Sequence, residues 1–171
     1  MKKIKFAVIE EDAVIPKRKN PTDAGIDLFV FFQGSEYLVY PDDVVIFRTG
    51  VTVDISKGYF GWITNKSSKD YLIGGGIVDQ DYQGELLVKV INTSTERLYF
   101  HHGDAVAQLL IVPCVTPEIE VVSPLEIHKN KTNRGKDGGI AKQADMEKSF
   151  THDRPEPRTS PPTSRPYPTL E

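Results

Sequence analysis

Residues 51–55, Val-Thr-Val-Asp-Ile, alternate apolar and polar side chains, as a strand with one buried and one exposed face requires. Four further segments alternate in the same way or are short β-branched runs: 26–30, 44–47, 86–91 and 106–112. Turn-forming residues separate these segments, which is typical of a β-sandwich or barrel. We therefore expect an all-β protein with very little helix, and the best helix candidate is the short segment 67–72.

The composition excludes several classes of protein. The length of 171 residues allows one domain with a sizeable core, and the net charge of −3 does not favour binding to the phosphate backbone of nucleic acid. A single cysteine, Cys114, excludes an intrachain disulfide framework and a cysteine-cluster zinc site. No segment resembles a signal peptide or approaches the roughly 20 apolar residues that span a membrane. We expect a soluble, cytoplasmic protein without a membrane or nucleic-acid partner.

The chain divides into three parts. Residues 1–128 carry the regular apolar pattern and are expected to form the folded domain. Residues 129–143 form a glycine-rich arm that we expect to be mobile, and the proline-rich segment 144–171 is predicted to be a disordered tail. The tail could dock an unknown partner as polyproline II, or it could simply be solvated.

An acidic and aromatic segment follows the apolar residues 77 and 78. Asp79, expected to be partly buried beside Ile77 and Val78, could orient or deprotonate a water molecule. Tyr82 offers a flat face for a sugar or a base, and Gly84 lets the main chain pass close to a ligand. The alternative is a β-turn in which the aspartate and the glycine serve geometry only.

Four other segments carry polar groups with two possible roles. In 64–68, Ser67 or Ser68 could cap a helix, or they could form a phosphate cradle with Lys66 at that helix N-terminus. Asp27, in the strand 26–30, could simply face solvent. Gln108, in the apolar strand 106–112, is either exposed or retained for hydrogen bonding. The loop 134–139 could wrap an anion or be a flexible linker.

In chain order, five segments resemble the five motifs of the trimeric dUTPases: 24–28, 66–68, 76–85, 103–109 and 134–138. The resemblance covers roughly residues 3–139 and implies a distorted jelly-roll β-barrel of the dUTPase type. It also implies a homotrimer with active sites between subunits, so that the motifs of one chain need not meet. The implied reaction is Mg²⁺-dependent hydrolysis of dUTP to dUMP and pyrophosphate.

The resemblance implies a role for each matching residue. Asp79 would hold the water that attacks the α-phosphorus, and Tyr82 would pack against deoxyribose. Main chain of the hairpin running from Gly76 to Tyr82 would read the uracil edge, with Gly76 and Ile77 among the substrate-binding residues. Asp27 would act near the metal, through water, while the triphosphate and further waters bind Mg²⁺. The remaining substrate-binding residues would be Lys66, Ser67, Ser68, Gln108 and Arg134.

Three departures from the family pattern carry expectations. Lys66 stands where the family has arginine, which keeps the charge but loses the bidentate fork, so we expect a weaker grip on the β-phosphate. The stretch between Ser68 and Asp79 is shorter than usual. Ile140 follows the fifth motif where an aromatic lid over uracil is expected, which predicts a looser closed state with lower activity or poorer uracil selectivity.

Two alternatives remain open. A dCTP deaminase shares this fold but needs a glutamate where this chain has Lys89, and Glu85 fits the dUTPase pattern instead. A catalytically impaired, dUTPase-like nucleotide-binding or regulatory protein is favoured by the altered second and fifth motifs. The retained residues of the other motifs oppose it, namely Asp79, Tyr82, Asp27 and Gln108.

Overall fold

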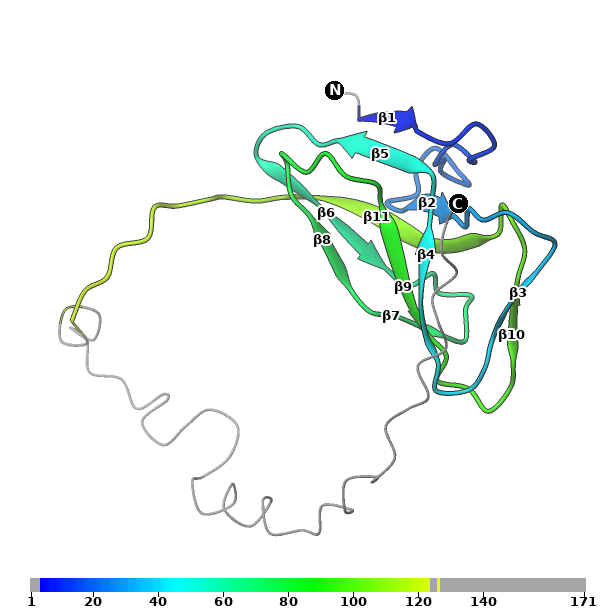
Figure 1. Ribbon diagram of the computed structural model, residues 1–171. Coiled ribbons are helices and arrows are strands. Elements are labelled where there is room, and N and C mark those ends of the chain that lie inside the picture. Colours follow the sequence, from blue (N-terminus) through cyan, green and yellow to red (C-terminus); the bar gives the residue numbers. More distant parts are fainter. Residues whose placement is uncertain (1–3, 124–125, 127–171) are drawn as a thin grey trace, which may run out of the picture. The chain divides into compact units, whose positions relative to one another are not determined.

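The computed structural model describes residues 4–123 and 126, and every element that it defines in 4–123 is a β-strand. The strands are β1 (Lys5–Val8), β2 (Ile26–Phe29), β3 (Tyr37–Val39), β4 (Val44–Arg48), β5 (Val51–Asp54), β6 (Tyr59–Thr64), β7 (Leu72–Ile73), β8 (Gly76–Val78), β9 (Leu87–Ile91), β10 (Leu98–Phe100) and β11 (Ala105–Pro113) (Figure 1). The strands expected from alternation are confirmed. Those five segments correspond to β2, β4, β5, β9 and β11, and they did not include β1, β3, β6, β7, β8 and β10.

The chain forms two compact units, Met1–Glu118 and Ile119–Glu171, and the first holds all the strands of the described part. In the second, only 119–123 and 126 belong to the described part. The predicted mobile arm at 129–143 and the predicted disordered tail at 144–171 lie outside the described residues, and so does Arg134. The limits of the expected domains therefore stay predictions.

The strands pair in four antiparallel sheets, whose orders are β2-β11-β6-β8, β4-β9-β7, β1-β5 and β3-β10. In Figure 1, β6 lies between β8 and β11, and β1 lies beside β5. This all-β arrangement confirms the expected jelly-roll type of fold. Pairing among the described strands does not run continuously around a closed barrel.

One apolar core joins the sheets. Leu28 of β2 and Leu109 of β11 are fully buried in the same cluster as Val88 and Val90 of β9. Within β9, residues 87 and 89 are exposed while 88 and 90 are buried, so the period of two seen in the sequence is the period of the pleat. Burying one face of each strand supplies the main driving force for folding.

The predicted short helix at 67–72 is wrong. The segment forms a turn, closed by a hydrogen bond of 3.2 Å from the Lys69 N–H to the Lys66 carbonyl. Two tertiary contacts explain why it does not continue as a helix. Tyr71 is buried and donates its hydroxyl to the Val106 carbonyl at 2.8 Å. The Asn65 side chain donates to the Tyr71 carbonyl at 2.5 Å and accepts from the Ile73 N–H at 2.9 Å, which leads the chain directly into β7.

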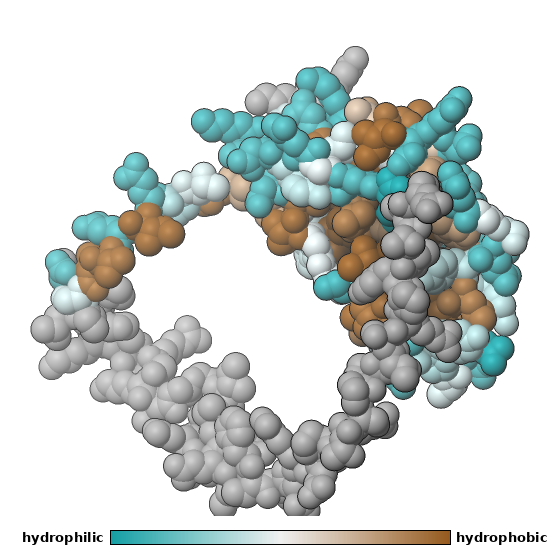
Figure 2. All heavy atoms as spheres, viewed as in Figure 1, coloured by the Kyte–Doolittle hydropathy of each residue, from teal (hydrophilic) through white to brown (hydrophobic). Residues whose placement is uncertain are grey.

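Several strands leave apolar side chains on the surface. On the outer face of the β4-β9-β7 sheet, Val44 and Ile46 are each 58% exposed and Leu72 is 52% exposed. Figure 2 shows hydrophobic side chains reaching the surface of the described part in several places. Patches of this kind often mark interaction surfaces. None of the described residues belongs to a helix that could cross a membrane.

Candidate functional site

The first, second and fourth motif-like segments meet at one end of the β2-β11-β6 sheet. Gln108 pairs with Asp27 on one side and with Thr64 on the other, so sheet register places the three in a row. Lys66 follows β6, and its ammonium contacts the Asp27 carboxylate. Both side chains are mostly buried, with 19% and 18% exposed. We call Asp27, Lys66 and Gln108 the phosphate-side cluster.

Gln108 serves hydrogen bonding rather than facing solvent, the two roles that the sequence left open. It is half-buried, and its side-chain N–H donates to the Asn65 carbonyl at 2.6 Å. A Cβ atom added at Gly25 would overlap the amide oxygen of Gln108, so only glycine at that position leaves room for this amide. The bond ties β11 to the turn that carries Lys66.

Ser67 and Ser68 are exposed and form the turn that follows Lys66. Because no helix follows in the described part of the chain, the predicted phosphate cradle at a helix N-terminus is wrong. The turn nonetheless brings two hydroxyls and an ammonium into one short segment beside Asp27. These groups are hydrogen-bond donors that suit phosphate oxygens.

The third motif-like segment forms a turn after β8. Asp79 is exposed, and its carbonyl accepts a hydrogen bond of 3.2 Å from the Tyr82 N–H. The expectation that Asp79 is partly buried is therefore wrong for this chain. The reason is that β8 is the edge strand of its sheet and, among the described strands, pairs only with β6. Among the described residues, no hydrogen-bond donor reaches the Asp79 carboxylate, which leaves both of its oxygens accessible.

The side chain of Tyr82 is fixed by a hydrogen bond within the segment 82–85. Its hydroxyl donates to the Glu85 carbonyl at 2.8 Å, and 42% of the residue is exposed. A Cβ atom at Gly84 would overlap that hydroxyl, so glycine allows the ring to lie against the main chain. The glycine thus serves the position of Tyr82.

Glu85 anchors this turn to the rest of the domain, a role that the sequence did not predict. One carboxylate oxygen accepts from the Thr49 N–H at 3.1 Å and from the Gly50 N–H at 2.7 Å. The other accepts from the Arg48 guanidinium at 2.9 Å, and Arg48 also contacts the Glu10 carboxylate. Hydrogen bonds to Glu10 and Glu85 raise the pKa of Arg48 further above its ordinary value. The only feature of the sequence that points to this contact is the opposite charge of Glu85 and Arg48, which lie far apart in the chain.

The phosphate-side cluster and the Asp79 turn lie apart in one chain. Val78 pairs with Gly61, whereas Gln108 pairs with Thr64 at the other end of β6. Asp79 is one residue beyond Val78, so it is displaced from Gln108 by about four residues along β6, or roughly 13 Å at the usual strand rise. A single chain therefore does not bring Asp79 to Lys66 and Asp27.

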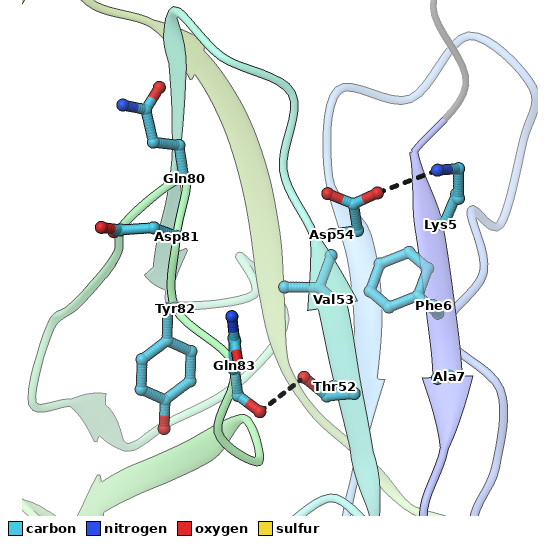
Figure 3. A pocket seen from close by; sticks show the side chains of 10 residues that line it. All are labelled: Lys5, Phe6, Ala7, Thr52, Val53, Asp54, Gln80, Asp81, Tyr82 and Gln83. Atoms are coloured by element: carbon cyan, nitrogen blue, oxygen red, sulfur yellow. Dashed lines mark hydrogen bonds and ion pairs between the residues drawn. The ribbon is translucent and has the colours of Figure 1, made fainter.

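Two cavities border the third motif-like segment. The one in Figure 3 has a volume of about 530 Å³ and lies between β1, β5 and the turn 80–83. It contains Tyr82 and an exposed ion pair of 3.0 Å between Lys5 and Asp54, but none of the phosphate-side cluster. The other has about 160 Å³ and is lined by Ile46, Ile63, Ile73, Gly75, Gly76, Leu87 and Lys89. It contains Gly76, which was predicted to read the base.

Asp27 is the residue that the family resemblance places near a metal ion. In the described part of the chain, no three histidine, cysteine, aspartate or glutamate side chains come together as a metal site. One carboxylate is nevertheless compatible with Mg²⁺, which keeps several waters and commonly binds to one or two carboxylates plus substrate phosphates. The carboxylate of Asp27 is therefore compatible with the expected magnesium, provided that the Lys66 ammonium leaves it.

Known proteins similar to this chain identify its family. The sequence profile of the dUTPase family matches residues 11–139. The chain is 37% identical over 139 residues to the probable deoxyuridine 5'-triphosphate nucleotidohydrolase of Invertebrate iridescent virus 6. It is 30% identical to the human mitochondrial deoxyuridine 5'-triphosphate nucleotidohydrolase and 31% identical to that of vaccinia virus strain Copenhagen. Each alignment covers 79% of this chain.

The lengths of these relatives differ. This chain spans about half of the first two, 45% of the iridescent-virus protein and 52% of the human one, but 89% of the vaccinia protein. Among solved structures, the dUTPase from phage phi11 of S. aureus is similar with a TM-score of 0.65 and 26% identity, over 73% of this chain and 99% of that chain. A point mutant of that phage dUTPase is described with a structural Mg(II) ion. By sequence profile, relatives and fold, this chain belongs to the dUTPase family.

Proposed function

We propose that this protein hydrolyses dUTP to dUMP and pyrophosphate with Mg²⁺, as a homotrimer whose active sites lie between subunits. The observation that carries the proposal is the phosphate-side cluster, in which sheet register pairs Asp27 with Gln108 and an ion pair holds Lys66 against Asp27. Family membership and the names of the relatives support the reaction. A cytoplasmic location stays a prediction from the composition.

Asp79 is proposed to hold and deprotonate the water that attacks the α-phosphorus. In-line attack needs a positioned water more than covalent chemistry, and a carboxylate with accessible oxygens can accept its proton. Tyr82 is proposed to pack against deoxyribose, because its hydroxyl bond to the Glu85 carbonyl fixes the ring while the residue remains partly exposed.

The phosphate-side cluster is proposed to bind the triphosphate. Lys66 supplies a positive charge, while Ser67, Ser68 and Gln108 supply neutral donors. Magnesium, when bound, would offset negative charge on the triphosphate, and Asp27 would hold it through water. Lys66 contacts Asp27, so its ammonium must leave that carboxylate, at least partly, to bind phosphate. Arg134 is proposed to contribute a further cation from outside the described residues.

The separation of roughly 13 Å along β6 between Asp79 and Gln108 supports sites shared between subunits. The exposed apolar side chains of the β4-β9-β7 sheet offer a surface that a second copy could cover. Two variants test this sharing. Asp79→Asn should lose turnover, and Lys66→Met should turn over poorly at dUTP concentrations well below its raised KM. At such a concentration, subunits exchanged between the two variants should regain roughly a quarter of the wild-type sites if each site uses two chains. No recovery after verified subunit exchange would contradict shared sites.

The activity itself is tested by product analysis. The purified chain is incubated with dUTP, dCTP, dTTP and UTP, each with Mg²⁺ and with EDTA. Release of dUMP and pyrophosphate from dUTP alone, dependent on Mg²⁺, is the expected result. Release of ammonia from dCTP would instead indicate a deaminase.

A second candidate is a dUTPase-like protein that binds nucleotide without turnover. The ion pair between Lys66 and Asp27 favours it, because the carboxylate of Asp27 neutralises the motif-two cation. Binding of dUTP without any product, in a folded protein, would support this candidate and contradict the hydrolase.

A further inference from the structure

The smaller cavity at the β7–β8 hairpin has the size of one flat ring. Its volume is about 160 Å³, and an engineered protein cavity of about 150 Å³ is known to hold benzene. Four of its lining side chains are aliphatic, and the hairpin adds the main chain of Gly75 and Gly76. A six-membered ring with polar groups at its edge suits apolar walls and main-chain donors and acceptors.

Among the described residues, Lys89 supplies the one charged side chain that lines this cavity. It belongs to β9, and its carbonyl accepts a hydrogen bond of 2.8 Å from the Gly74 N–H. A Cβ atom at Gly74 would lie only 2.6 Å from Cδ and 3.0 Å from Cγ of Lys89. The stem of Lys89 therefore occupies the space that a side chain at Gly74 would fill, and this contact keeps it against the hairpin.

The ammonium of Lys89 has no partner within the described part of the chain. No carboxylate there forms a salt bridge with it, in contrast to the ammonium groups of Lys5 and Lys66, which pair with aspartates. An ammonium offers three donors and no acceptor. On a residue that lines a ring-sized cavity, such a group favours a ring whose substituent is a carbonyl oxygen.

We propose that Lys89 is a specificity-determining residue that donates to the 4-carbonyl oxygen of uracil and disfavours cytosine. Cytosine carries an amino group at that position, so two donors would face each other and at least one would lose its partner. The proposal rests on the proposed function in one respect, since it takes the cavity beside Gly76 as the place of the base. It also gives a physical reason for the chain to select dUTP over dCTP.

The test is calorimetric titration of the 171-residue chain with dUMP and with dCMP. Lys89→Met keeps a long aliphatic stem beside Gly74 and removes the ammonium. We expect the wild type to prefer dUMP and the variant to lose roughly tenfold to a hundredfold of that preference, the range for a hydrogen bond to a charged group. Lys89→Arg, which retains a cationic donor, should keep most of it.

Two further variants sharpen the test. Lys57→Met removes an exposed lysine that does not line the cavity, so it should leave the preference unchanged. Lys89→Glu introduces an acceptor, and carboxylates accept from the amino group of cytosine, so it should shift the preference towards dCMP. Circular dichroism and light scattering establish that each variant keeps the fold and assembly of the wild type.

The outcomes separate this inference from the proposed function. If the wild type hydrolyses dUTP but Lys89→Met keeps the full preference for dUMP, the role of Lys89 is wrong and the hydrolase stands. A second outcome is that the wild type prefers dUMP, the Lys89→Met variant does not, and the wild type hydrolyses no nucleotide. Lys89 would then recognise the base in a binding protein. A wild type without preference for dUMP overturns the inference.

Discussion

The phosphate-side cluster and the Asp79 turn differ in how far one chain completes them. In the cluster, the carboxylate of Asp27 and the ammonium of Lys66 neutralise each other, and Gln108 is held by a bond of 2.6 Å. In the turn, Asp79 is exposed and its carboxylate has no donor among the described residues. The chain thus positions the groups proposed to bind the triphosphate, whereas the proposed general base, Asp79, stays exposed in one chain.

The two regions are also held in place differently. The cluster owes its geometry to the pairing of three neighbouring strands. The turn is fixed at its base, where Glu85 binds the main chain of Thr49 and Gly50 and the side chain of Arg48. We therefore expect substitutions in the turn to separate into effects on chemistry and effects on stability.

The largest effect is expected for Asp79→Asn, which isolates the chemistry of the turn. Asparagine is similar in shape but cannot accept a proton as a carboxylate does, so kcat for dUTP should fall about 10² to 10⁴-fold. Calorimetry with dUTP should show that binding is retained, because the phosphate-side cluster is unchanged. A kcat within a factor of a few of the wild type would remove Asp79 from the proposed mechanism.

The next effect is expected for Glu85→Ala, which removes the anchor of the turn. Two main-chain donors and Arg48 lose their acceptor, so the free energy of unfolding should fall by about 2 to 3 kcal/mol. Urea denaturation measures this change. Glu85→Gln keeps an acceptor for the Thr49 and Gly50 N–H groups and serves as the matched control, with a smaller loss. Equal stability of Glu85→Ala and the wild type would show that the anchor is not needed.

A smaller effect is expected for Lys66→Met in the phosphate-side cluster. It removes the cation proposed for phosphate and leaves Asp27 without its ion-pair partner. The KM for dUTP should rise roughly tenfold, because one charge-assisted contact is lost. Lys66→Arg should restore or improve on the wild-type KM, since guanidinium binds phosphate with two parallel bonds. An unchanged KM in Lys66→Met would place the triphosphate elsewhere.

The smallest effect is expected for Tyr82→Phe, which keeps the ring and removes its bond to the Glu85 carbonyl. A looser ring should discriminate less between dUTP and UTP, by no more than about tenfold, the usual worth of one neutral hydrogen bond. The ratio of kcat/KM for the two nucleotides measures the change. A larger loss would mean that the hydroxyl itself contacts substrate.

Local features of the sequence were sufficient for the main strands and for the order of the motif-like segments. The alternation at 51–55 became β5, and the polar residue inside the apolar run 106–112 proved to be hydrogen-bonded. Prediction failed where a distant partner decides. The segment 67–72 is not helical because Tyr71 reaches the Val106 carbonyl, and Asp79 is exposed because β8 has only one neighbour among the described strands.

The sequence by itself determined the all-β class, the family resemblance and the candidate residues, because strand periodicity and motif spacing are local properties of the chain. Only the tertiary structure decided which candidates meet. Lys66 contacts Asp27 although 39 positions separate them, and Glu85 contacts Arg48 across 37 positions. Both contacts depend on strand pairing that no local pattern encodes. The same pairing put Lys89 beside Gly74 and kept Asp79 away from the phosphate-side cluster. Hydrogen bonds and ion pairs act over a few ångströms in space, whatever the separation along the chain.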